Sequence, residues 1–187
     1  MNAVRRFIAV EGPIGVGKTT LARRLADRFR ASLLLERPEE NPFLERFYRD
    51  PAGAALPTQL HFLFQRARQM AELRQTEIFH EVQVSDFLMD KDRLFARLNL
   101  DDHEFDLYEQ VYRRLSVDAP APDLVVYLQA PVPVLLERIR RRGIGYEQDM
   151  DPGYLETLSG AYVNFFRRFE EAPVLVVDAG ASCLLYT

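Results

Sequence analysis

The sequence predicts an α/β fold in which a parallel β-sheet is flanked by helices on both faces. Short apolar runs alternate along the chain with longer segments of helical pattern, which is typical of this class. A glycine-rich turn joins the first apolar run to the first helical segment, as expected of a strand–turn–helix unit. At 187 residues, with 48% hydrophobic and 28% charged residues, the chain fits one domain with a sizeable core.

The expected elements follow in order along the chain. The five apolar runs that we expect to form strands are 7–10, 32–35, 82–85, 124–128 and 174–177. The helical segments are 19–29, 57–77, 91–98, 104–115, 133–142 and 152–170. Ligands of parallel α/β sheets bind at the carboxyl ends of the strands. The residues that directly follow each run are therefore the first candidates for a functional site.

The glycine-rich turn has the pattern of a phosphate-binding loop. Residues 12–19 read Gly-Pro-Ile-Gly-Val-Gly-Lys-Thr, so backbone N–H groups and the next helix N-terminus would surround a phosphate. Lys18 would reach the outer phosphates and the Thr19 hydroxyl would bind Mg²⁺. The motif predicts a nucleoside triphosphate site and a three-layer fold like that of the P-loop NTPases. The residues expected to hold the nucleotide are Gly12, Pro13, Ile14, Gly15, Val16, Gly17, Lys18, Thr19 and Thr20.

Two carboxylates stand at strand ends. Glu36 follows the second expected strand and Asp86 follows the third. Beside a bound nucleotide, a carboxylate serves either as the base for an attacking hydroxyl or as a Mg²⁺ ligand. The alternative for each is a helix cap or a solvated surface position, but two strand ends beside a phosphate loop favour the functional interpretation.

An arginine-rich segment, 138–147, ends the helix expected at 133–142. It is either a solvated helix end or a lid whose arginines stabilise charge on the transferred phosphoryl group, and we favour the lid. The glycines at 143 and 145 would give such a lid its flexibility.

Composition excludes several functions. The net charge of −4 gives no support for a nucleic-acid polymer or an anionic membrane as partner. No apolar run approaches the length of a membrane helix, and the N-terminus lacks a secretory pattern. The single cysteine, Cys183, excludes an internal disulfide and a cysteine-based metal site. We therefore expect a soluble cytoplasmic enzyme.

From about residue 6 to residue 178 the chain resembles the deoxynucleoside kinase family, specifically the bacterial deoxyadenosine and deoxyguanosine kinases. Residues 36–44 are similar to the family segment that begins with the catalytic base, and 47–51 are similar to its Tyr-x-Asp-Pro segment. Gln59 lies eleven residues after Tyr48, at the family position that binds the nucleobase edge. Glu147 matches a family residue of the lid.

The resemblance implies a role for each matched residue. Glu36 would be the base, with Lys18 and Arg142 stabilising the charge of the transferred group and Thr19 with Asp86 holding Mg²⁺. Tyr48 and Glu147 would bind the sugar 3′-hydroxyl, Gln59 the nucleobase edge, and Phe95 would stack on the base. The implied activity is transfer of the γ-phosphate of ATP to the 5′-hydroxyl of a deoxynucleoside, most often a purine one, in nucleotide salvage. Family members form homodimers or heterodimers with a related subunit.

The chain departs from the family pattern at three positions. Phe87 follows Asp86 where the family has an arginine, so Arg93 is a candidate substitute for that cation. Ile144 stands at the second arginine position of the lid, which leaves Arg142 as the matching residue. Arg37 replaces the proline that follows the base.

Two alternatives remain from the sequence. One is a thymidylate-kinase-like enzyme that accepts a nucleoside monophosphate, and the other is a nucleotide-binding partner subunit without turnover.

We expect residues 1–178 to form the kinase domain. Residues 179–187 end in Cys-Leu-Leu-Tyr-Thr, which resembles a translated sequencing adapter, and we expect this tail to mark a C-terminal truncation.

Overall fold

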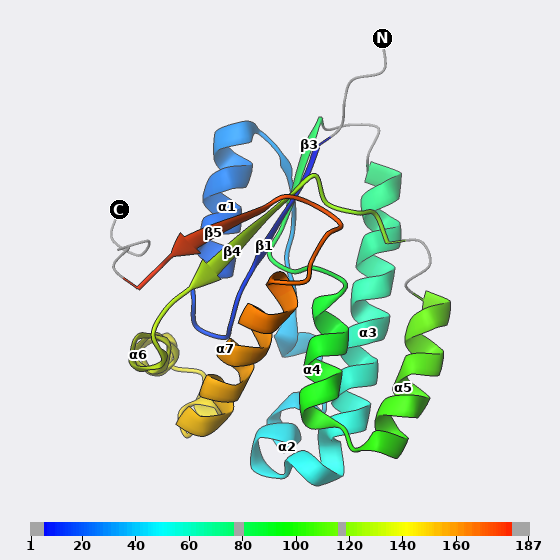
Figure 1. Cartoon of the computed structure of the whole chain (residues 1–187), viewed down its shortest axis with the longest axis vertical. Helices are drawn as coiled ribbons and strands as arrows, with labels where there is room; N and C mark the ends of the chain where they lie inside the picture. The colour runs from blue at the N-terminus through cyan, green and yellow to red at the C-terminus, as the bar shows by residue number, and fades with distance from the viewer. Residues whose placement is uncertain (1–5, 77–80, 116–118, 181–187) are drawn as a thin grey trace. The chain divides into compact units, whose positions relative to one another are not determined.

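The computed structural model describes residues 6–76, 81–115 and 119–180, and Figure 1 shows the path of the chain. The chain divides into two compact units. The first, called the sheet unit here, comprises Met1–Leu35, Thr76–Leu88 and Ala121–Thr187. The second, called the helical unit, comprises Glu36–Gln75 and Met89–Pro120. Each unit is described by itself.

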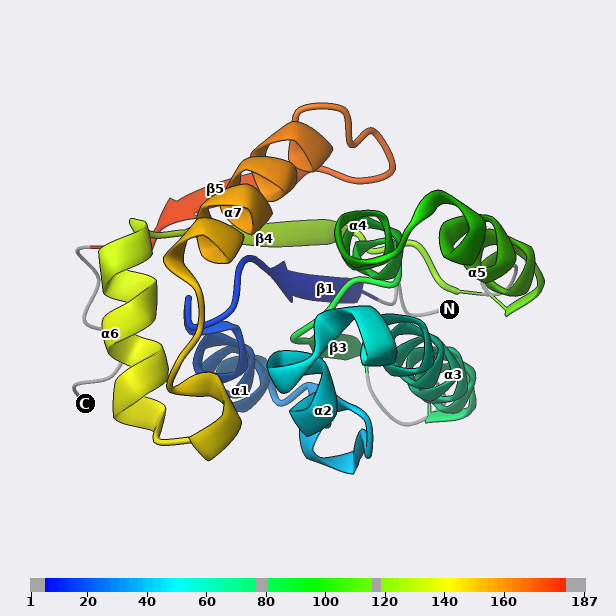
Figure 2. The same ribbon diagram turned by 90° about the horizontal axis from the view of Figure 1, so that it is seen from below.

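The sheet unit contains an all-parallel, five-stranded sheet with the strand order β2-β3-β1-β4-β5. The strands are β1 (Arg6–Glu11), β2 (Ser32–Leu34), β3 (Val82–Ser85), β4 (Leu124–Gln129) and β5 (Val174–Asp178). Figure 2 shows β5, β4, β1 and β3 side by side in this order. Each strand matches an expected apolar run to within about two residues, so the predicted α/β class with a parallel sheet is confirmed.

The middle of this sheet is its most buried part. Ala9 and Val10 of β1 and Val125 and Leu128 of β4 are fully buried, as expected where side chains on both faces are covered. Helices α1 (Lys18–Phe29), α6 (Val132–Arg142) and α7 (Pro152–Phe166) belong to the same unit, as does the short η2 (Gly145–Glu147). The ring of Phe166 on α7 lies 4.4 Å from that of Tyr127 on β4.

The helical unit holds the remaining helices. They are η1 (Pro38–Glu40), α2 (Leu44–Arg49), α3 (Pro51–Thr76), α4 (Lys91–Asn99) and α5 (Asp102–Leu115). The sequence did not predict η1 or α2, and it placed the start of α3 at Pro57. The helix begins at Pro51 instead, and Pro57 lies inside it. A proline is tolerated at the first helical position, because the N–H that it lacks would have no partner within the helix.

Among the described residues, no helix combines the length and apolar character needed to cross a bilayer.

Candidate active site

The loop between β1 and α1 has a backbone that requires glycine. Gly12, Gly15 and Gly17 have φ angles of +148°, +82° and +105°. A Cβ on Gly12 would lie 2.4 Å from the carbonyl oxygen of Leu128, and one on Gly15 would lie 2.8 Å from that of Leu135. Both the backbone angle and the space therefore exclude other residues, which leaves the loop amides free of side chains at close range.

The Lys18 ammonium lies against this loop. Its Nζ donates to the carbonyl oxygens of Gly12, at 2.8 Å, and Pro13, at 3.2 Å. The first residue of α1 thus holds a positive charge beside the loop, where the helix N-terminus adds its own positive end. Both features favour an anion at this place.

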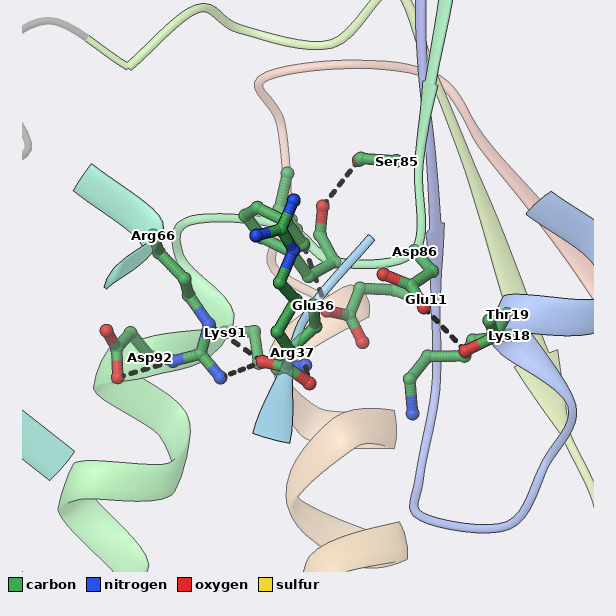
Figure 3. A network of polar contacts seen from close by, with 12 residues as sticks. Glu11, Lys18, Thr19, Glu36, Arg37, Arg66, Ser85, Asp86, Lys91 and Asp92 are labelled. Atoms are coloured by element: carbon green, nitrogen blue, oxygen red, sulfur yellow. Dashed lines mark hydrogen bonds and ion pairs between the residues drawn. The ribbon is translucent and has the colours of Figure 1, made fainter. Parts of the chain in front are cut away.

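Thr19 and Asp86 bring two oxygens together. The Thr19 hydroxyl donates to Oδ2 of Asp86 at 2.5 Å (Figure 3). Asp86 is only 3% exposed, and its backbone N–H donates to Leu34 O at 3.2 Å, so the end of β3 holds the carboxylate in place. A hydroxyl and a carboxylate oxygen are ligands of the kind that Mg²⁺ prefers.

Glu11 supports the loop from beneath, and the sequence analysis did not single it out. Its side chain is fully buried and accepts three hydrogen bonds. Oε2 accepts from the backbone N–H of Gly12 at 2.7 Å and from the Tyr162 hydroxyl at 3.0 Å, and Oε1 accepts from the N–H of Leu88 at 3.0 Å. The available signal was an acidic residue at the end of a buried strand, directly before the glycine-rich turn.

Two arginines of the arginine-rich segment make different kinds of contact. Arg142 donates to the carboxylate of Glu147, which is 5% exposed, so the two predicted lid residues lie in contact. Arg138, in contrast, donates to the carbonyl oxygens of Val16, at 3.1 Å, and Ala179, at 2.7 Å. Arg138 therefore ties α6 to the phosphate loop through backbone contacts, while Arg142 remains nearly half exposed.

Glu36, in the helical unit, lies between two cations. Its Oε1 accepts from Nε of Arg66 at 3.0 Å and also from Nη2 of Arg66, and its Oε2 accepts from Nζ of Lys91 at 3.2 Å (Figure 3). Arg66 also contacts Asp92, with Nη1 2.8 Å from Oδ1. The side chains of Arg66, Lys91 and Asp92 are 4%, 3% and 0% exposed, so this is a buried network of charges.

Burial and pairing act in opposite directions on this network. Burial by itself would lower the pKa of Arg66, but the neighbouring carboxylates of Asp92 and Glu36 outweigh it and raise that pKa. Burial also raises the pKa of Asp92, although Arg66 opposes the shift. Arg66 therefore stays charged, and the network fixes the direction in which the Glu36 carboxylate points.

Arg93, the predicted substitute for the missing family arginine, has a different place. Its Nε donates to Glu109 at 2.6 Å, its guanidinium lies over the ring of Tyr112, and its side chain is 51% exposed. The cations that contact Glu36 in the structure are instead Arg66 and Lys91. Their contacts join residues 30 and 55 positions apart, so no local pattern in the sequence announces them.

Three of the four predicted nucleoside-binding residues belong to the same unit. Tyr48 on α2, Gln59 on α3 and Phe95 on α4 all belong to the helical unit, where Gln59 is 3% exposed and Phe95 lies 5.8 Å from the Lys91 ammonium. Glu147 belongs to the sheet unit. The pairing of Tyr48 with Glu147 on one hydroxyl therefore stays a prediction.

The helical unit contains a group of buried polar atoms that form no hydrogen bond within the described part of the chain. They include Thr58 Oγ1, Gln59 Oε1, His61 Nδ1, Gln65 Oε1, Asp92 Oδ2 and Tyr108 OH. In the sheet unit, the corresponding atom among the described residues is Ser159 Oγ. Buried polar groups normally have a partner, so these atoms can bind water or a polar ligand.

Comparison with known proteins decides the family. The model of the family described as "Deoxynucleoside kinase" matches residues 8–185. The chain belongs to the deoxynucleoside kinase family. It is 34% identical to a deoxyguanosine kinase of Bacillus subtilis over 92% of this chain and 86% of the relative. It is 29% identical to a deoxyadenosine/deoxycytidine kinase of the same organism, over 90% and 80%.

A solved structure agrees with the fold. The structure of deoxyadenosine kinase from M. mycoides with bound dATP superposes with a TM-score of 0.81 at 27% identity, covering 92% of this chain and 91% of that one. This confirms the predicted P-loop NTPase-like fold and the resemblance to the family. The chain is an ATP-dependent phosphotransferase that acts on deoxynucleosides, and these matches favour it over a thymidylate-kinase-like enzyme or a partner subunit without turnover. Residues 181–187, with Cys183 and most of the predicted tail, lie outside the described residues.

Proposed function

We propose that this kinase phosphorylates the 5′-hydroxyl of a purine deoxynucleoside, with Glu36 as the general base. The purine preference is supported by the relatives, which are named for deoxyguanosine and for deoxyadenosine with deoxycytidine. The observation that carries the role of Glu36 is its position between two buried cations. A carboxylate held from both sides keeps one orientation, which is what a base needs to take a proton from a substrate hydroxyl.

The phosphate side of the reaction would use the loop of the sheet unit. Lys18 and Arg142 would face the phosphate charge, as cations do in phosphoryl-transfer enzymes. Thr19 and Asp86 would hold Mg²⁺ through the hydroxyl and carboxylate oxygens that already lie 2.5 Å apart. When bound, Mg²⁺ neutralises charge on the phosphates.

The nucleoside side rests on the helical unit and on the family resemblance. The side-chain amide of Gln59 offers one acceptor and two donors, and its buried carbonyl oxygen has no hydrogen bond from the residues that the structure describes. Such a group can bind a nucleobase edge at two points. Phe95 would stack on the base, and Tyr48 with Glu147 would bind the 3′-hydroxyl.

The assembly and the location of the enzyme also follow from the family. We expect a homodimer, or a heterodimer with a related subunit, in the cytoplasm. The mass of the purified protein, measured by light scattering during gel filtration, tests the first expectation.

The experiment that tests this function compares Glu36→Gln with Glu39→Gln, an exposed carboxylate on the neighbouring turn. Turnover is measured with Mg·ATP on the four deoxynucleosides and thymidine monophosphate. The parent should phosphorylate deoxyadenosine or deoxyguanosine most efficiently. Glu36→Gln should reduce kcat by about 10²–10⁴ while ATP affinity is unchanged, because only the base is lost.

Glu39→Gln should retain the activity of the parent. A Glu36→Gln enzyme with parental kcat would show that another group takes the proton. A preference for pyrimidine deoxynucleosides would contradict the proposed substrate class.

A further inference from the structure

Lys91 is a buried lysine at the N-terminus of a helix, where a positive charge destabilises the helix. It is 3% exposed and is the first residue of α4. The N-terminus of a helix carries a partial positive charge, so a cation there is unfavourable. Lysine is also rarely buried unless it is paired. Its position therefore requires a specific partner, and the carboxylate of Glu36 lies 3.2 Å from its ammonium.

The charge balance of the network shows why two cations are needed. Arg66 contacts Glu36 and Asp92 at the same time. If Arg66 were the single cation, it would have to compensate both the buried carboxylate of Asp92 and the partly buried carboxylate of Glu36. With Lys91, two positive and two negative side chains balance, and leaving one buried charge uncompensated would be strongly destabilising.

The residue after Asp86 cannot provide this second cation. Phe87 is fully buried and apolar, at the position where the family resemblance leads us to expect an arginine. The chain instead continues for four residues and presents the ammonium from the first turn of α4. The ammonium of Lys91 lies over the ring of Phe95, 5.8 Å from its centre.

We propose that Lys91 is a positioning residue of this kinase, which holds the carboxylate of Glu36 in the orientation needed for proton transfer. The inference rests on the proposed role of Glu36. Lys91 acts through Glu36, so its removal should affect the chemical step rather than the binding of ATP. Among the described residues, the charged groups that pair with Glu36 include Arg66 from α3 and Lys91 from α4, and Asp92 pairs with Arg66.

The test compares Lys91→Met, Lys91→Ala and Lys91→Arg with Arg93→Met, a neighbouring cation of α4 that pairs with Glu109. Lys91→Met should reduce kcat roughly 10- to 100-fold, which is typical of a displaced catalytic group, with an unchanged KM for ATP. The acid limb of the kcat–pH profile should move to higher pH, since a carboxylate that has lost a neighbouring cation is protonated more easily. Lys91→Arg should keep the limb near that of the parent, and Arg93→Met should change neither quantity.

Chemical rescue provides the second measurement. Added ethylammonium should restore part of the kcat of Lys91→Ala, because it returns a primary ammonium to the vacated place. Lys91→Met with the kcat and pH profile of the parent would overturn the inference, as would a folded Lys91→Ala that ethylammonium does not rescue. If Lys91→Met does not fold, a Lys91→Arg enzyme whose acid limb moves as far as 1 pH unit or so would overturn it equally.

Glu36→Gln, assayed alongside, separates this inference from the proposed function. If Glu36→Gln loses turnover while the Lys91 variants behave like the parent, the base is established and the positioning role is wrong. If Glu36→Gln keeps turnover, the proposed function fails first.

Discussion

The sheet unit and the helical unit differ in how their predicted binding residues are built into the fold. In the sheet unit, the phosphate loop is built from backbone, and its shape follows from glycines with positive φ and from contacts to carbonyl oxygens. In the helical unit, the residues predicted to bind the nucleoside act through side chains, and several buried polar atoms of this unit form no hydrogen bond within the described chain. The shape of the first site thus depends on backbone conformation, whereas that of the second depends on side chains from several helices.

This difference matches the two substrates. The triphosphate part of a nucleotide is the same for every donor, and a rigid backbone loop suffices to bind it. Nucleosides differ at the edges of their bases, which only specific side-chain donors and acceptors distinguish. Substitutions in the sheet unit should therefore affect stability and ATP binding, and substitutions in the helical unit should affect the choice and turnover of the nucleoside.

Outside the charge network around Glu36, the largest expected effect comes from Gly15→Ala in the phosphate loop. At φ +82°, with a Cβ only 2.8 Å from Leu135 O, alanine should lower the free energy of unfolding by roughly 1–3 kcal/mol and weaken ATP binding about tenfold. Gly160→Ala, on α7, is the matched control, because a Cβ there meets nothing within 4 Å. Urea denaturation and calorimetric titration with ATP give both quantities. If the two variants had the same free energy of unfolding and the same affinity for ATP, the backbone of the phosphate loop would not be rigid.

An intermediate effect is expected from Gln59→Leu in the helical unit. Removal of the amide leaves the base edge without its partner, which should lower kcat/KM for the preferred deoxynucleoside roughly tenfold, while KM for ATP stays at the parental value. Gln110→Leu, on the exposed side of α5, is the control and should have no effect. Steady-state kinetics with each substrate varied in turn measures this. A change in KM for ATP of the same size would remove the distinction between the two units.

The smallest effect is expected from Asp90→Asn, at the start of α4. Burial raises the pKa of the Asp90 carboxyl above its ordinary value of 3.8, although a hydrogen bond from the Tyr112 hydroxyl opposes the shift. A raised pKa in the folded state means that this carboxyl contributes its stability below about pH 3.8, and that the contribution is lost as pH rises through the folded pKa. The free energy of unfolding of the parent, relative to Asp90→Asn, should therefore fall between pH 3.5 and pH 7 or so. Thermal unfolding at several pH values tests this, and a constant difference would place Asp90 in a more solvated environment.

Much of the sheet unit could be predicted because its signals are local. The strands appear as continuous apolar runs, and the phosphate loop, Lys18 and Thr19 stand in one short motif. Asp86 followed from the rule that sites form at strand ends, and its contact with Thr19 agrees with that prediction. Glu11 was not predicted because only one of its donors, the N–H of Gly12, is a neighbour in the sequence, whereas Leu88 and Tyr162 lie 77 and 151 positions away.

The helical unit was less predictable. Glu36 could be placed from its position, but Arg66 and Lys91 could not, because a charged residue on a helix is most often a solvated one. Arg93 was the nearest arginine in the sequence, yet α4 directs it toward Glu109 and turns Lys91 toward Glu36. Helix α2, which lies between Pro42 and Pro51, was missed because its six residues are too few to establish a periodic pattern.

The contact between Glu11 and Tyr162 has a consequence for the synthesis of this protein. The two residues are 151 positions apart, and Tyr162 supplies the third donor to the carboxylate beneath the phosphate loop. On the ribosome, the loop sequence emerges early, but the carboxylate lacks this donor until α7 has also been made. A nascent chain that stops before α7 would leave Glu11 with an unfilled hydrogen bond in the core. We therefore expect the nucleotide site to mature at the end of synthesis, although its motif stands at the beginning of the chain.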